Sequence, residues 1–179
     1  MKKIVGLLFL IASFSSANAQ KIYATKSASI KFFSSTPMED IEAINNQVES
    51  KLTDKGQIMF ALLIKGFVFE NELMQEHFNQ PDWMDSNKYP KADFKGIINN
   101  FNKVNLAVNG TYPVTVSGNL TIRGISKKTT ATGTITVKDG KVSSNSVFKL
   151  AVTDFGITGK DIGKSIAKEL QITVNSKYN

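Results

Sequence analysis

The sequence predicts an all-β fold in a single domain, and two observations in its 179 residues support this prediction. Apolar and polar side chains alternate with period two along most of the chain, as in strands with one buried and one solvated face. Turn residues such as Asp139-Gly140, a pair favoured in two-residue hairpins, separate these stretches at short intervals. The count of stretches predicts eight or nine antiparallel strands, which form either a closed barrel or a two-sheet sandwich.

The strands follow from the alternation in chain order. The clearest is 112–122, in which Tyr112, Val114 and Val116 share one face while Pro113 and Thr115 share the other. The other stretches have the same pattern over shorter lengths. The strands are expected at about 28–32, 48–52, 57–69, 92–98, 104–108, 112–122, 130–138, 142–152 and 170–174.

Two segments interrupt the alternation, and each has the pattern of a short helix. Asn71 is suited to cap a helix that begins at Glu72, whose carboxylate is favourable beside the positive helix end. The segment 161–169 carries Ile162 and Ile166 and predicts a second short helix. We expect the first helix, together with the apolar loop after it, to cover one end of a barrel.

The first 19 residues have the pattern of a secretory signal peptide. Lys2 and Lys3 precede an apolar run at 4–14, and Ala17-Asn18-Ala19 forms a cleavage site. The apolar run is too short for a membrane-spanning helix, which needs about 20 residues. We therefore expect a mature domain at 20–179 that is exported, either to a periplasm or to the outside of the cell.

The composition excludes several kinds of chemistry. The chain has no cysteine and one histidine, so disulfides, thiolate metal sites and His-rich metal sites are not expected, and no catalytic residue, metal or cofactor is predicted. His77 lacks a hydrolase motif around it, although Asp82 and Asp85 follow in the same loop region. Residues 97–179 carry a net charge of +7, which indicates either an anionic partner or ordinary solvated lysines. The lysines are scattered, so no nucleic-acid partner is predicted.

The inward faces of the predicted strands contain both large apolar and very small residues. An eight-stranded barrel is just wide enough to be filled by side chains or to hold one small ligand. The small positions are Ser50, Gly96, Gly118, Ala131, Gly133, Ser144 and Ser146. A cavity and a solid core in which large and small residues alternate both fit this pattern. If a cavity is present, its expected lining is Phe60, Leu62, Phe94, Gly118, Leu120, Ile122, Gly133, Phe148 and Leu150.

Four short motifs, in this order and spacing, resemble those of the YceI-like family. They are Met74-x-x-His77-Phe78, Tyr89-Pro90-Lys91-Ala92-Asp93-Phe94, Gly118-Asn119-Leu120-Thr121-Ile122-Arg123-Gly124-Ile125-Ser126-Lys127 and Asp154-Phe155-Gly156-Ile157. The resemblance covers about residues 22–175 and implies an extended, eight-stranded, lipocalin-like antiparallel barrel with one or two short helices at an end. It also implies export and an apolar tunnel for a polyisoprenoid, such as an isoprenoid quinone or polyprenyl lipid.

The sequence and the resemblance together predict a non-enzymatic carrier that sequesters a polyisoprenoid or another long apolar lipid. Five residues are expected to line the mouth or form its lid: Leu73, Met74, His77, Phe78 and Trp83. Arg123, Lys127 and Lys128 surround a turn at Gly124 and are either a head-group contact, which implies transient contact with a membrane surface, or a solvated hairpin end. The alternatives are an enzyme acting on a lipid through His77 with Asp82 or Asp85, and a ligand-free structural or stress-related protein. The oligomeric state is not predicted.

Overall fold

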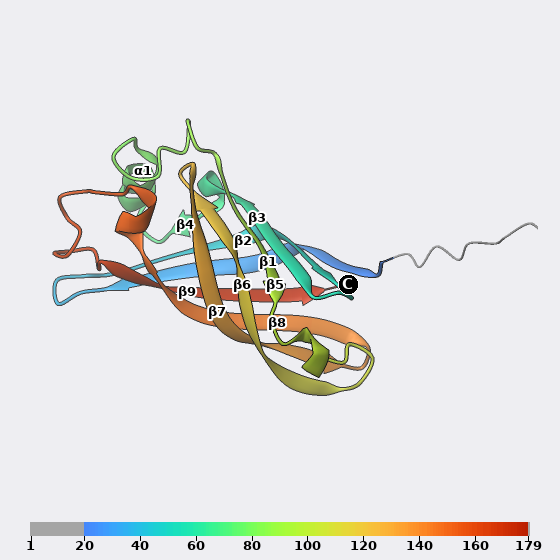
Figure 1. Cartoon of the computed structure of the whole chain (residues 1–179). Helices are drawn as coiled ribbons and strands as arrows, with labels where there is room; N and C mark the ends of the chain where they lie inside the picture. Colours follow the sequence, from blue (N-terminus) through green and yellow to red (C-terminus); the bar gives the residue numbers. More distant parts are fainter. Residues whose placement is uncertain (1–19, 179) are drawn as a thin grey trace, which may run out of the picture.

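The computed structural model describes residues 20–178, which form one β-barrel with a short helix at one end (Figure 1). The predicted signal peptide at 1–19 lies outside the described residues. The strands are β1 (Ile22–Ser35), β2 (Asp40–Thr53), β3 (Gln57–Leu63), β4 (Val68–Phe69), β5 (Lys91–Ile98), β6 (Gly110–Ile122), β7 (Ile125–Lys138), β8 (Lys141–Ala151) and β9 (Glu169–Tyr178). The α-helix is α1 (Glu72–Asn79), and the 3₁₀ turns are η1 (Ile64–Gly66), η2 (Phe101–Lys103) and η3 (Val152–Phe155).

The sheet closes on itself, which confirms the predicted eight-stranded antiparallel barrel. Its strand order is β1-β9-β8-β7-β6-β5-β3-β2, and β1 pairs with β2 from Ile22↔Thr53 to Ser35↔Asp40 to complete the circle. The two-residue β4 lies beside β2 as a ninth strand outside this circle. Closure gives each strand of the circle a neighbour on both sides for part of its length and creates an interior lined by inward-facing side chains.

The expected hairpin turn at Asp139-Gly140 is confirmed. Lys138 pairs with Lys141, and Asp139 and Gly140 have φ angles of 51° and 75°. Two left-handed residues in a row are what a type I′ turn requires. A second hairpin turn of the same kind joins β6 to β7 at Arg123 and Gly124, which have φ angles of 51° and 74°.

Three local predictions from the sequence are wrong. The segment 161–169 forms turns and an isolated bridge between Ile162 and Ile166, because Asp161 O accepts from both Lys164 N and Ile166 N and closes a tight loop. The stretch 104–108 is a turn after η2 and pairs with no strand within the described chain. The stretch 57–69 breaks at η1, where Ile64 N bonds to Pro90 O.

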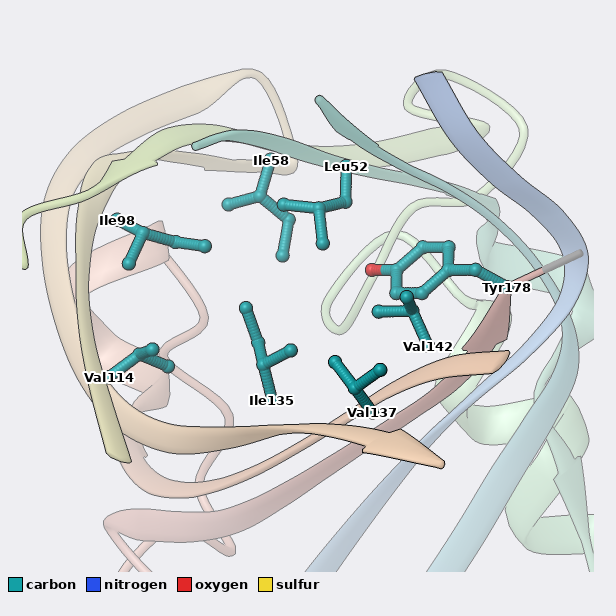
Figure 2. Packing of buried hydrophobic residues seen from close by; sticks show 8 residues of the cluster. All are labelled: Leu52, Ile58, Ile98, Val114, Ile135, Val137, Val142 and Tyr178. Carbon is teal, nitrogen blue, oxygen red and sulfur yellow. The ribbon is translucent and has the colours of Figure 1, made fainter. Parts of the chain in front are cut away.

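One end of the barrel, near the β7–β8 turn and the end of β9, is packed solid. Figure 2 shows large side chains from several strands that point toward one another across the interior, where they form a buried cluster. They are Leu52, Ile58, Ile98, Val114, Ile135, Val137, Val142 and Tyr178. Ser50 Oγ and Tyr178 Oη form a buried hydrogen bond of 3.0 Å at this end. Burial of this many apolar side chains supplies the main free energy for closing the barrel.

In residues 20–178, no helix has the length and hydropathy required to cross a membrane.

Candidate functional site

The opposite half of the barrel, beneath α1, contains a large apolar cavity. Its volume is about 490 Å³, and side chains from every strand of the closed wall contribute to its lining. Cavities that bury a small organic ligand typically have about 300–1,000 Å³. Ile58, Ile98, Val114 and Ile135 belong both to the packed cluster and to the lining, so the packed end forms the floor of the cavity.

Most of the predicted lumen residues do line this cavity. They are Phe60, Leu62, Phe94, Leu120, Ile122, Gly133, Phe148 and Leu150. They come from five different strands, and each lies at an inward position of the period-two pattern. The cavity wall is therefore made by the same alternation that makes the strands.

Gly118 was expected in this lining, and the structure places it under another side chain instead. Gly118 pairs with Gly96 across the β5–β6 ladder, and the Phe94 ring lies over both glycines. A methyl group on Gly118 would lie 2.7 Å from Phe94 Cζ, and one on Gly96 would lie 2.6 Å from the same atom. These two glycines make room for the Phe94 ring, and only the ring contributes to the cavity.

The small residues of β7 and β8 are the ones that leave the cavity open. Ala131, Gly133, Ser144 and Ser146 all line it, whereas the predicted small position Ser50 lies at the packed end with Tyr178. A methyl group on Gly133 would overlap the Asn145 carbonyl oxygen of the neighbouring strand. Gly133 thus lets β7 and β8 approach closely, and Ala131 is the better position at which to add volume.

The helix α1 lies beside the cavity and contributes Leu73, Met74, His77 and Phe78 to its lining. Asn71 Oδ1 accepts hydrogen bonds from Leu73 N at 2.9 Å and Met74 N at 3.3 Å, which confirms the predicted cap. No residue of the helix is fully buried, so its position depends on a few contacts.

Those contacts are mainly aromatic. The Phe78 ring lies 5.6 Å from Phe32 of β1 and 5.1 Å from Phe69 of β4, measured between ring centroids. Phe67, after η1, lies 5.6 Å from Phe78. Aromatic rings at these separations attract one another beyond their simple burial. This aromatic cluster, Phe32, Phe67, Phe69 and Phe78, holds the helix against the barrel wall.

All five predicted lid residues line the cavity. Met74 and Phe78 are half-buried on the wall, Leu73 is 58% exposed, and the His77 side chain is exposed at the rim. Trp83, in the loop after α1, is half-buried with its indole ring against Gly159. The helix and loop therefore surround the opening, and whether they contact a ligand remains a prediction.

Arg123 joins the lid loop to the segment after η3. Its Nη1 donates to Gly156 O at 2.6 Å and its Nη2 donates to Pro81 O at 2.7 Å. The Tyr89 ring also packs on Gly124, beside Arg123. Three of the sequence motifs thus meet in one place, where Arg123 acts as a brace between loops with both ends of its guanidinium group engaged.

Lys127 and Lys128 are exposed, and neither they nor Arg123 line the cavity. Lys127 lies opposite Leu120, and Lys128 lies opposite Asn119, so the two side chains project from opposite faces of the hairpin. Their role as a head-group contact remains a prediction.

The β7–β8 part of the barrel wall is paired over only part of its length. The β7–β8 ladder ends at Gly133↔Ser146, although β7 continues back to Ile125 and β8 continues to Ala151. In Figure 1, β7 and β8 separate toward the end that carries α1. Thr134 and Asn145 pair on the outer face and nevertheless contribute to the cavity lining.

Of the three residues proposed for an alternative active site, one lines the cavity. His77 lines the cavity, whereas Asp82 and Asp85 do not. Asp85 has a φ of 46° and its backbone carbonyl accepts from Lys88 N and Tyr89 N, so its place is in a turn. Within residues 20–178 no group of three or more His, Cys, Asp or Glu side chains is arranged to hold a metal ion.

Sequence reasoning missed several residues around the mouth. Phe32 had the signal of strand alternation, and Phe67 and Phe69 lay in a stretch interpreted as one continuous strand. Glu39 in the β1–β2 turn, together with Asp161 and Ser165 in the segment before β9, also lines the cavity. These polar residues are far apart in sequence and carry no local signal, because only the closure of the barrel brings their loops together.

A family model, the YceI-like domain, matches residues 15–178. No curated protein matches the chain in sequence.

Solved structures with the same fold cover most of the chain. BcnA of Burkholderia cenocepacia is 19% identical, with a TM-score of 0.70 over 85% of this chain and 96% of its own. A polyisoprenoid-binding domain from Saccharophagus degradans is 10% identical, with a TM-score of 0.75 over 88% and 97%. A Campylobacter jejuni YceI protein is 16% identical, with a TM-score of 0.54 over 100% and 99%. At these identities the neighbours show the fold alone, and it is the family model, which matches nearly the whole described chain, that makes this protein a member of the YceI-like family.

Proposed function

We propose that this protein is an exported carrier that sequesters a polyisoprenoid or another long apolar lipid in the hollow half of its barrel. The observation that carries the proposal is the cavity of about 490 Å³, lined almost throughout by aliphatic and aromatic side chains. Family membership and the fold shared with a polyisoprenoid-binding domain support a binding protein rather than an enzyme. Each methylene that a lipid buries in such a cavity gains about 0.8 kcal/mol.

Export is supported by the pattern of residues 1–19, which is that of a cleaved secretory signal peptide. A carrier outside the cytoplasm collects its lipid from a membrane surface, so we propose transient contact with a membrane. Met38, in the β1–β2 turn, is 74% exposed, and Leu73 of α1 is 58% exposed. Both belong to the end of the molecule with the mouth, where an exposed apolar side chain can enter the lipid surface.

The first experiment extracts the purified protein with organic solvent and analyses the extract by mass spectrometry. A stoichiometric long-chain lipid is the expected result. A chemically altered lipid after incubation would instead favour an enzyme, and His77 would be the first residue to replace. A protein that neither retains nor takes up any lipid would contradict the carrier proposal and favour a structural role.

The second experiment adds volume inside the cavity. Ala131→Phe places a ring in the lining, whereas the control Thr132→Phe places the same ring on the exposed outer face of β7. We expect Ala131→Phe to lower uptake of a prenyl lipid and Thr132→Phe to leave it unchanged. Emission from Trp83, the only tryptophan of the chain, reports binding at the mouth. Equal uptake by the two folded variants would contradict a ligand-holding lumen.

A further inference from the structure

The Asp, Glu, Lys and Arg residues that line the cavity within residues 20–178 are all acidic. Among residues 20–178, no lysine or arginine contributes to its lining, although this part of the chain is rich in lysine. The acidic residues that do line it are Glu39 and Asp161. His77 belongs to the same rim, and the remaining polar lining there is Ser34, Asn71 and Ser165.

Glu39 and Asp161 lie on loops that are held together at the mouth. Ala167 N donates to Ser34 Oγ at 2.9 Å, which ties the segment containing Asp161 to the end of β1. In the β1–β2 turn, Thr36 Oγ1 accepts from Glu39 N at 3.1 Å. This bond fixes the backbone of Glu39.

Neither carboxylate is neutralised within the described residues. The ion pairs formed there are Lys31–Glu42 and Lys149–Glu169, both on the outer surface of the barrel. Glu39 and Asp161 are both half-buried and both line the cavity, so their negative charges lie beside an apolar space. In such surroundings charges are screened less than at a fully exposed surface.

The two carboxylates would interact differently with a charged and an uncharged head group. A phosphate held there would meet two carboxylates and no cationic partner in the lining, and a charge taken out of water without a partner is strongly unfavourable. An uncharged hydroxyl or carbonyl group is not repelled by the carboxylates, and no charge has to be removed from water when it binds. A hydroxyl can donate to Glu39 or Asp161, and a carbonyl can accept from the Ser34, Ser165 or Asn71 side chains.

We propose that the protein selects polyisoprenoids with an uncharged, hydrogen-bonding head group and rejects polyprenyl phosphates, and that Glu39 and Asp161 impose this choice. The inference rests on the proposed lipid-carrier function and specifies its ligand. It differs from a head-group role for Lys127 and Lys128, because their side chains lie outside the cavity lining.

The test measures binding of farnesol and farnesyl phosphate, which share one prenyl chain, to the delipidated protein by Trp83 emission and by competition. We expect the wild type to prefer farnesol by at least about tenfold, since like charges brought together at a binding surface cost several kcal/mol. In Glu39→Lys/Asp161→Lys, the two compounds should bind equally well, or farnesyl phosphate should bind more tightly. Glu39→Gln/Asp161→Asn should reduce the preference for farnesol with a smaller structural change.

The control is Glu49→Lys/Glu76→Lys, which alters the net charge equally at exposed positions outside the lining. This control should keep the wild-type preference. Tight binding of farnesyl phosphate by the wild type would overturn the inference and leave the carrier function standing. A preference that survives in both mouth variants, or that the control also loses, would overturn the assignment to Glu39 and Asp161. Failure to bind either compound, or any longer prenyl lipid, would instead overturn the proposed function itself.

Discussion

The two halves of the barrel share the same strands but are filled differently. At the packed end, inward positions hold large side chains such as Leu52, Val137 and Tyr178, all at most 4% exposed. In the half beneath α1, the inward positions of β7 and β8 include Ala131, Gly133 and Ser146, and a cavity of about 490 Å³ remains. The period-two pattern continues through both halves in β6 and β7, whereas irregularities in the β1–β2 pairing between Thr25 and Ile30 shift it by one residue where the halves meet. The halves differ mainly in the sizes of the inward side chains and in the way the wall closes.

This difference shows how one small barrel can be stable and hollow at once. The packed half buries a continuous apolar cluster and requires no ligand to do so. The hollow half is closed by a helix held through the aromatic cluster and by loops braced by Arg123, rather than by a filled interior. A missing interior atom costs the contacts it would have made, so the packed half offsets what the hollow half lacks.

The largest expected effect comes from truncating one leucine in each half. Leu52→Ala opens a cavity in a filled core and should lower the free energy of unfolding by about 2–5 kcal/mol. Leu150→Ala enlarges a cavity that already exists, and its half-buried side chain should cost about 1–2 kcal/mol. Urea denaturation of the lipid-free proteins measures both. An equal loss in the two variants would contradict the division into packed and hollow halves.

An intermediate effect is expected at Arg123, which serves the hollow half alone. Arg123→Ala removes hydrogen bonds to Pro81 O and Gly156 O and should cost up to about 1.5–3 kcal/mol, the range for bonds to charged groups. Hydrogen exchange should rise in the loops at 80–90 and 153–159, and Trp83 emission should shift to longer wavelength. Lys127→Ala removes a charge from the same hairpin without breaking these bonds, and it should leave both signals unchanged. Unaltered exchange in Arg123→Ala would show that the loops do not depend on this brace.

The smallest effect is expected from the polar pair at the packed end. Tyr178→Phe leaves Ser50 Oγ buried without its partner and should cost about 0.5–1.5 kcal/mol. Removing both partners in Ser50→Ala/Tyr178→Phe should recover part of this loss. Tyr112→Phe, which loses an exposed bond to Val108 O, is the control. Lipid uptake should be the same in all three, and a lower uptake in Tyr178→Phe would mean that the cavity extends into the packed end.

Much of the fold was predictable because it depends on local signals. The alternation along 112–122, the Asp139-Gly140 turn and the Asn71 cap each use interactions within a few residues, and each is present in the structure. The wrong predictions share one cause. The residues at 104–108 and 161–169 have apolar spacing that suits a strand or helix, but they are short and their ends are fixed by turns, where tertiary contacts override weak local preference.

The candidate site was predictable in part. The inward faces of the strands identified most of the lining, and the insert after Asn71 identified further lining residues, because both follow from which face is apolar. The prediction that Gly118 lines the cavity was wrong. Alternation indicates that a residue points inward, but it does not indicate which neighbouring side chain covers that residue. The Phe94 ring, from the adjacent strand, occupies that space.

By itself, the amino-acid sequence determined the strands, their inward faces, the capped helix and the resemblance to a family, since these depend on residue order and short-range chemistry. Only the tertiary structure decided that the lumen is hollow at one end and filled at the other, because a cavity depends on the summed volumes of side chains from many strands. It also decided that Arg123 spans two distant loops, and that Glu39 and Asp161 line the same cavity. Barrel closure creates these neighbours between segments separated by more than a hundred residues, as between Ser34 and Ala167.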